Sequence, residues 1–122
     1  MLSLTTVMIN SEDPSALSAF YTKVLGKPGW EDAGYVGWQA GGATLMIGPH
    51  SEVKGPNETP GRIMINFETQ DVKGEFDRLK ALGATVQQEP YQPGPAGGDM
   101  WLATLADPDG NYFQLASPMP AQ

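Results

Sequence analysis

Asp107-Pro108-Asp109-Gly110-Asn111-Tyr112-Phe113-Gln114-Leu115, close to the end of the 122-residue chain, is the segment around which the predicted fold is organised. Its first five residues have turn chemistry, because proline fixes φ, glycine permits a positive φ, and the acidic and amide side chains can bond to nearby backbone. The residues that follow alternate, with Phe113 and Leu115 on one face and Tyr112 and Gln114 on the other. The stretch predicts a tight turn and a terminal strand whose second face, only half polar, either lines a cavity or belongs to a plain edge strand.

Size and composition indicate one compact domain with many turns. The 122 residues suffice for one core but not for two independent ones. Fifteen glycines and 11 prolines favour short strands separated by turns. There is no cysteine and no apolar run long enough to span a bilayer, which fits a cytoplasmic protein. The net charge of -7 would repel nucleic acid and anionic membranes and would attract a cationic small molecule.

The first half predicts a strand, a helix and three further strands. Residues 2–10 alternate, and Val7 and Ile9 are expected to face the helix. Asp13 is expected to cap a helix over residues 14–25, whose apolar side chains recur with helical spacing. The three short strands are expected around Trp30 and over residues 35–39 and 43–47.

The same order of elements returns after a loop over residues 49–61. Residues 62–68 alternate as a strand, and Asp71 is expected to cap a helix over residues 72–82. The later strands are expected at 85–89, 100–106 and 111–116, with a proline- and glycine-rich loop over 92–98. The chain therefore reads as two copies of one βαβββ unit, about 2–48 and 62–118, which we expect to pair into one curved sheet.

Together these features resemble the vicinal oxygen chelate superfamily, which includes glyoxalase I, bleomycin-resistance proteins and extradiol dioxygenases. The resemblance rests on the two units, on a first helix ending Phe20-Tyr21-x-x-Val24-Leu25-Gly26, and on the closing Asp107-Pro108-Asp109-Gly110-Asn111. It covers nearly the whole chain. It implies a single α+β domain with one curved, partly closed mixed sheet, helices outside, a ligand cavity inside, and a homodimeric assembly.

Metal-dependent members of that family hold a divalent ion with four side chains that face the cavity. When the four family positions are counted from the helix-capping aspartates and the turn glycines, the corresponding residues in this chain are Thr6, Met46, Met64 and Gln114. Two thioethers, a hydroxyl and an amide offer none of the carboxylate, imidazole or thiolate groups that such ions prefer. The only histidine, His50, lies in the loop between the units. We therefore expect no metal and no other cofactor.

Without a metal, the expected inner face describes a binding pocket. Methionine adapts to flat or irregular ligands, and tryptophan or tyrosine can stack on rings or cations. We expect an aromatic or cationic small molecule, although any single methionine or tryptophan could instead belong to the core. The residues expected to bind the ligand are Thr6, Met8, Trp38, Met46, Arg62, Met64, Asn66, Trp101, Tyr112 and Gln114.

Three functions stay open at this point. The first is a metal-free binding protein of the bleomycin-resistance type that sequesters a drug or metabolite and so confers antibiotic resistance. The second is a glyoxalase-like lyase or a dioxygenase, and the third is a dimeric interaction or regulatory module. Catalysis has little support, because there is no cysteine and no strand histidine, and only Glu68 or Asp99, if buried, could act as a general base. No catalytic residue is assigned.

Overall fold

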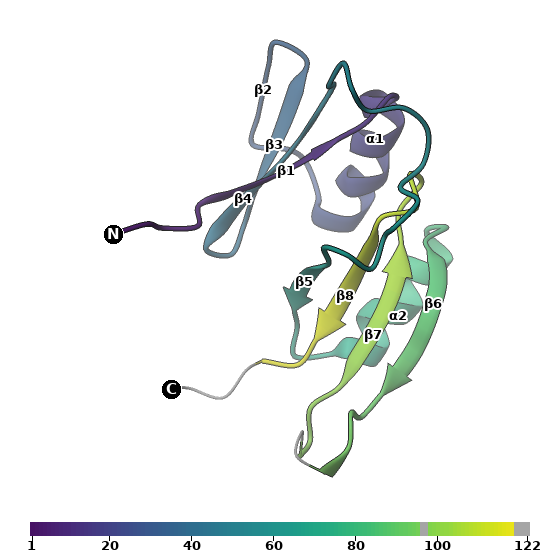
Figure 1. The fold of residues 1–122 in the computed structure, drawn as a ribbon. Helices are drawn as coiled ribbons and strands as arrows, with labels where there is room; N and C mark the ends of the chain where they lie inside the picture. The colour runs from purple at the N-terminus through teal and green to yellow at the C-terminus, as the bar shows by residue number, and fades with distance from the viewer. Residues whose placement is uncertain (96–97, 119–122) are drawn as a thin grey trace. The chain divides into compact units, whose positions relative to one another are not determined.

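The structure is a computed structural model that describes residues 1–95 and 98–118. The chain divides into two compact units, Met1–Pro56 and Asn57–Gln122, and each contains a four-stranded sheet and one helix (Figure 1). The first unit consists of β1 (Thr6–Asn10), α1 (Pro14–Leu25), β2 (Trp30–Asp32), β3 (Tyr35–Ala40) and β4 (Ala43–Gly48). The second consists of β5 (Ile65–Glu68), α2 (Val72–Ala81), β6 (Thr85–Tyr91), β7 (Leu102–Ala106) and β8 (Tyr112–Ala116). The predicted α+β class and the two βαβββ repeats are confirmed.

The two sheets have the same topology. Their strand orders are β1-β4-β3-β2 and β5-β8-β7-β6. In each, the first strand of the unit runs parallel to the last, and the other pairs are antiparallel. We expected one sheet, but the strands pair as two, because the opening strand of each unit bonds to the closing strand of the same unit.

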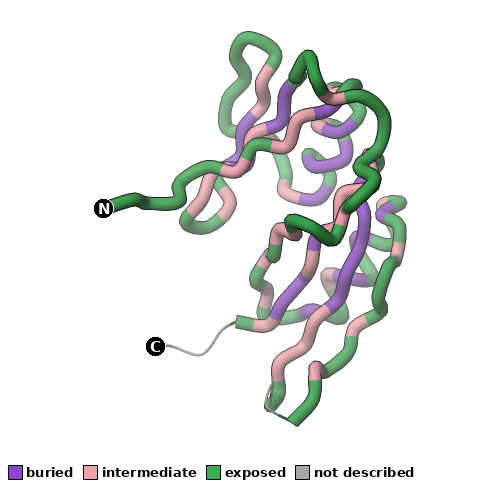
Figure 2. The backbone as a smooth tube through the Cα atoms, in the orientation of Figure 1, coloured by how far each residue is buried: buried purple, intermediate pink, exposed green. Residues whose placement is uncertain are grey.

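In the first unit, α1 covers one face of its sheet. Asp13 caps the helix by accepting a hydrogen bond from the backbone N–H of Ala16 at 3.2 Å, and Pro14 occupies the first position, where no N–H is needed. The helix buries the predicted stripe, of which Leu17 and Tyr21 are almost fully enclosed. The other buried apolar side chains of this unit are Phe20, Val24, Trp38, Leu45 and Ile47. Figure 2 colours the backbone by burial and shows buried segments in the helix and in the strands of this unit.

In the second unit, α2 covers its sheet in the same way. Asp71 accepts a hydrogen bond from the N–H of Gly74 at 2.9 Å and so caps the helix. Phe113 is completely buried, and the Phe67 ring meets it edge to face with centroids 5.9 Å apart. The remaining buried apolar side chains are Val72, Phe76, Leu79, Ala84, Ala103, Leu105, Ala106, Leu115 and Ala116.

Several element boundaries differ from the expected ones. The fifth strand begins at Ile65 rather than at residue 62, because the chain turns just before it, where the N–H of Arg62 donates to the carbonyl of Thr59. The sixth strand runs on through Pro90, which an edge strand tolerates since its outer N–H groups need no partner. The seventh begins at Leu102 rather than at residue 100. Residues 96 and 97 of the expected loop over 92–98 lie outside the described residues.

Neither helix in the described part of the chain is long and apolar enough to cross a membrane.

A buried carboxylate organises the turn between β7 and β8. Asp107 is only 4% exposed, and its Oδ1 accepts hydrogen bonds from the backbone N–H groups of Asp109 at 2.9 Å and Asn111 at 3.0 Å. Its Oδ2 also accepts from the Asn111 side-chain amide at 3.0 Å. Gly110 completes the turn with φ 81°, and its N–H donates to the Asp107 carbonyl. Outside the turn, Asn57 donates to the Asp109 carbonyl and to the Asn111 side chain, which ties the start of this unit to the turn.

We predict that Asp107→Ala lowers the free energy of unfolding by about 3 kcal/mol. The substitution leaves several donors without their charged acceptor in a buried place, and each such loss costs about 1–3 kcal/mol. Urea unfolding followed by circular dichroism measures the change. Asp109→Ala is the matched control, because that residue uses only its backbone in the turn, and it should cost less than about 1 kcal/mol. Equal losses in the two variants would contradict this account of the turn.

Candidate functional site

Each sheet has a second face that its helix does not cover, called here the open face. In the first unit, buried Leu45 and Ile47 alternate along β4 with the half-buried Thr44 and Met46. In the second unit, buried Phe113 and Leu115 alternate along β8 with Tyr112, Gln114 and Ala116. Of the strand side chains, those on the open faces are the ones left to meet a ligand or a partner.

Strand register brings one set of side chains into line across the open face of the first sheet. Met8 pairs with Met46, Met46 pairs with Gly37, and Gly37 pairs with Trp30. We call these four residues the methionine row. Met8 is 50% exposed and Trp30 is 41% exposed, so two thioethers and an indole form an accessible apolar strip across all four strands.

The indole of Trp30 lies against the sheet because Gly37 has no side chain. A Cβ atom at Gly37 would lie 2.7 Å from Cε2 of the indole, a distance that real side chains essentially never show. Gly48 is overlaid in the same way by the ring of Tyr35, whose hydroxyl donates to the carbonyl of Pro49 at 3.1 Å. Two aromatic rings are therefore seated on two glycines of the same face.

A tight hairpin places Trp30 opposite Gly37. The loop between β2 and β3 has two residues, Ala33 and Gly34, with φ values of 52° and 86°. Two positive φ values in a two-residue loop match the twist of the flanking strands. The hairpin thus returns β2 onto β3 in the register that sets the indole over the glycine.

The open face of the second sheet has a different chemistry in the equivalent places. Asn66 pairs with Gln114, Gln114 with Thr104, and Thr104 with Gln88. We call these four residues the amide row. The Gln114 side-chain amide donates to the Thr104 hydroxyl at 3.0 Å. The two units therefore share a register but present an apolar row in one and a neutral polar row in the other.

Most of the residues expected to bind a ligand lie on an open face. In the first unit these are Thr6, Met8 and Met46, and in the second they are Asn66, Tyr112 and Gln114. Met64 precedes β5, and its carbonyl accepts from the Asn66 amide at 3.4 Å. Arg62 was expected on a strand, but it lies before β5 and is exposed.

Both Trp38 and Trp101 were placed wrongly among the ligand-facing residues. Trp38 pairs with Leu45 on the helix-covered face, is 3% exposed, and donates from Nε1 to the Gly26 carbonyl at 2.8 Å. Trp101 precedes β7, and Lys73 of α2 places its ammonium 3.9 Å from the centre of the ring. Both indoles already have partners in the fold.

Two residues of the amide row, Thr104 and Gln88, were missed from the sequence. The alternation of Thr104 with the apolar Ala103 and Leu105 was a usable signal. Gln88 had no such signal, because register shifts interrupt the pairing of β6 with β7. Only the observed pairing puts these two side chains in line with Gln114.

The family's four metal positions do not fit a divalent ion in this chain. Register confirms that Met46 and Gln114 occupy equivalent places in the two units, since they pair with Met8 and Asn66. A donor set of two thioethers, a hydroxyl and an amide lacks any anionic or imidazole ligand. Within residues 1–95 and 98–118, no group of three or more histidine, cysteine, aspartate or glutamate side chains could hold a metal ion.

The structure gives no support to Glu68 or Asp99 as a buried general base. Glu68 and Asp99 are both exposed, whereas a general base was expected only if one of them were buried. His50 lies in a loop, where its Nδ1 accepts from the backbone N–H of Glu52 at 3.1 Å.

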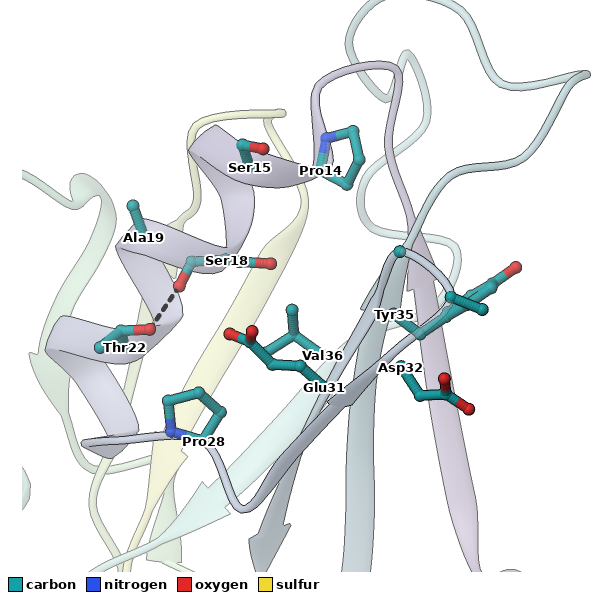
Figure 3. Close-up of a pocket in the computed structure, with 12 residues that line it drawn as sticks. Pro14, Ser15, Ser18, Ala19, Thr22, Pro28, Glu31, Asp32, Tyr35 and Val36 are labelled. Carbon is teal, nitrogen blue, oxygen red and sulfur yellow. Dashed lines mark hydrogen bonds between the residues drawn. The ribbon is translucent and has the colours of Figure 1, made fainter.

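A groove of about 750 Å³, which the sequence did not predict, lies between α1 and the β2–β3 hairpin (Figure 3). Ser15, Ser18 and Thr22 border it from the helix, and the Thr22 hydroxyl donates to the Ser18 carbonyl at 2.8 Å. Glu31 and Val36 point toward the helix, while Asp32 and Tyr35 point to the other side of the hairpin. The groove is on the helix side of the sheet and is separate from the methionine row.

Comparison with solved structures shows where else this fold occurs. A glyoxalase/bleomycin resistance protein/dioxygenase family enzyme from Burkholderia phytofirmans PsJN superposes with a TM-score of 0.76 at 24% identity, over 97% of this chain and 100% of that one. A glyoxalase-related enzyme from Fulvimarina pelagi gives 0.76 at 20% identity, over 99% and 94%. A lactoylglutathione lyase from Agrobacterium tumefaciens gives 0.71 at 22% identity, over 94% and 92%. At these identities the likeness shows the fold alone.

Sequence comparison is more specific. No curated protein matches the chain. The profile of the glyoxalase-like domain family, in contrast, matches residues 6–116, from the first residue of β1 to the last residue of β8. The chain therefore belongs to the glyoxalase-like domain family, within the vicinal oxygen chelate superfamily.

Proposed function

We propose that this protein binds a flat, largely apolar small molecule on its methionine row and uses no metal to do so. The observation that carries the proposal is the exposed indole of Trp30, which lies against Gly37 in line with Met8 and Met46. Its role would be to sequester a drug or metabolite, as in antibiotic resistance. A lyase or dioxygenase is less well supported, because the metal positions lack suitable ligands.

The energetics favour a ligand that stacks. The Trp30 ring lies against Gly37 and remains 41% exposed, so a planar ligand can cover apolar surface without first ordering the indole. Stacking of one ring on an aromatic side chain contributes about 1–3 kcal/mol. The adaptable thioethers of Met8 and Met46 can follow the outline of an irregular ligand. The net charge of -7 favours a neutral or cationic ligand over an anion.

We predict that purified protein binds the neutral dye 1-N-phenylnaphthylamine at the methionine row and that Trp30→Ala weakens this binding about tenfold, as expected for losing about 1.4 kcal/mol of stacking. The rise in dye fluorescence on titration measures the affinity. Tyr91→Ala is the matched control, because Tyr91 is equally exposed (40%) but lies in the second unit. Gly37→Ala should weaken binding as well, by displacing the indole. No saturable binding, or equal loss in the control, would overturn the assigned site.

We predict that the protein binds no stoichiometric divalent metal. A metal bound to the folded state at a hundredfold excess over Kd would add about 2.7 kcal/mol of stability and raise the Tm by several degrees. Elemental analysis and melting curves with nickel, zinc, manganese or cobalt, and with a chelator, should show no difference from buffer alone. One metal per chain would return a glyoxalase-like enzyme to first place.

We also propose a homodimer in which a second copy covers apolar side chains that one chain leaves exposed. Leu4 is 84% exposed in the first unit and Ile63 is 78% exposed in the second, and strands β1 and β5 are sheet edges. We predict that sedimentation velocity at high micromolar concentration gives the mass of two chains. A monomer at that concentration would refute the proposal. The charge of -7 argues against nucleic acid or anionic membranes as partners.

A further inference from the structure

We propose that the amide row of the second unit is a binding site for an uncharged group that offers a hydrogen-bond donor and acceptor side by side, as a carboxamide or a lactam does. The row consists of Asn66, Gln114, Thr104 and Gln88, aligned across β5, β8, β7 and β6. The inference goes beyond the function proposed above, because it concerns the other sheet and a polar ligand group.

The hydrogen bonds within the row leave defined groups for a ligand. The Gln114 amide donates one N–H to the Thr104 hydroxyl at 3.0 Å. Its second N–H and its Oε1 stay available to a ligand. The Asn66 amide donates one N–H to the Met64 carbonyl at 3.4 Å. Its second N–H and its Oδ1 likewise stay available to a ligand. Within the described residues, neither of these two oxygens accepts a hydrogen bond. Each of these two amides thus keeps one donor and one acceptor, and the two lie opposite each other on adjacent strands, whose spacing is about 4.8 Å.

The fold does not require polar residues in these places. The equivalent places of the first unit hold Met8, Met46, Gly37 and Trp30 in the same register. An apolar row is therefore compatible with the same backbone. Thr104 is only 7% exposed, and burying polar groups whose hydrogen bonds are incomplete costs stability. The polar chemistry of the second row is better explained by recognition than by folding.

The charge of the row selects a neutral group. None of its four side chains ionises, so an ionic ligand group would find no counterion in the row. Glu68 lies two register positions further along, opposite Ala116, and is exposed. An amide side chain can form two parallel hydrogen bonds with a partner edge that carries one donor and one acceptor, as Asn and Gln do with adenine. Carboxamides and lactams both present such an edge, the first from a flexible group and the second from a ring.

Three probes that differ only in their polar group test the charge preference, namely benzamide, benzoate and benzylamine. In ¹H–¹⁵N spectra, the side-chain NH₂ signals of Asn66 and Gln114 report directly on the row. We expect saturable shifts of these signals with benzamide and none with benzoate or benzylamine. δ-Valerolactam distinguishes a ring lactam from an open carboxamide, and stronger binding of either identifies the source. Equal shifts with the charged probes, or no shift with either amide, would overturn the inference.

Gln114→Met is the decisive variant, because methionine occupies the equivalent place, Met46, in the first unit. It should weaken benzamide binding at least tenfold while keeping a dispersed spectrum. Gln39→Met is the matched control, since that amide already donates to the carbonyls of Gly41 and Ala43, and it should bind benzamide normally. Should Gln114→Met fail to fold, Asn66→Leu serves the same purpose. Binding that survives at both positions would refute the site.

Failure of this inference and failure of the proposed function can be told apart. The dye titration reports on the methionine row of the first unit, and the NH₂ signals report on the amide row of the second. Loss of benzamide binding in Gln114→Met with normal dye binding supports two separate sites. Dye binding without any benzamide effect removes the amide site and leaves the proposed function standing.

Discussion

The buried carboxylate of Asp107 is the constraint on which the second unit depends. It accepts from the backbone of Asp109 and Asn111, and so sets where β7 ends and β8 begins. The ladder that follows pairs Leu105 with Phe113 and Thr104 with Gln114. Because side chains alternate across a strand, a slip of one residue would turn Gln114 toward the helix and Phe113 toward solvent. One turn therefore determines both the core and the face available to ligands.

The repeated unit separates architecture from chemistry. Both units cap their helix with an aspartate. In both, the first strand pairs in parallel with the last strand, in an equivalent register. Within that common frame one open face presents thioethers and an indole, and the other presents amides and a hydroxyl. The helix packs on the opposite face of each sheet, so the residues of the open face can differ between the units. This is how one family fold accommodates different functions.

The three tryptophans illustrate how packing assigns roles to one residue type. Trp38 points to the helix and satisfies its indole N–H on Gly26, so it belongs to the core. Trp101 has a cation over its ring, supplied by Lys73. Trp30 lies over a glycine on the open face and remains exposed. An indole can bury most of its surface and still need one polar partner, and buried Trp38 finds that partner in the Gly26 carbonyl.

The local elements could be predicted from the amino-acid sequence, since helix caps and apolar spacing act over a few residues. Asp13 and Asp71 mark the helix starts, the apolar spacing marks the buried stripes, and the Asp107–Asn111 turn marks the last strand. The two-fold repeat of the βαβββ unit and the resemblance to the family could also be recognised from the amino-acid sequence. The pairing of the eight strands as two sheets became visible in the folded chain. The same holds for the positions of Trp38 and Trp101 away from the open faces, and for the alignment of Thr104 and Gln88 within the amide row. These features depend on which distant strands pair and in what register, and a bulged strand such as β6 does not reveal its register through alternation.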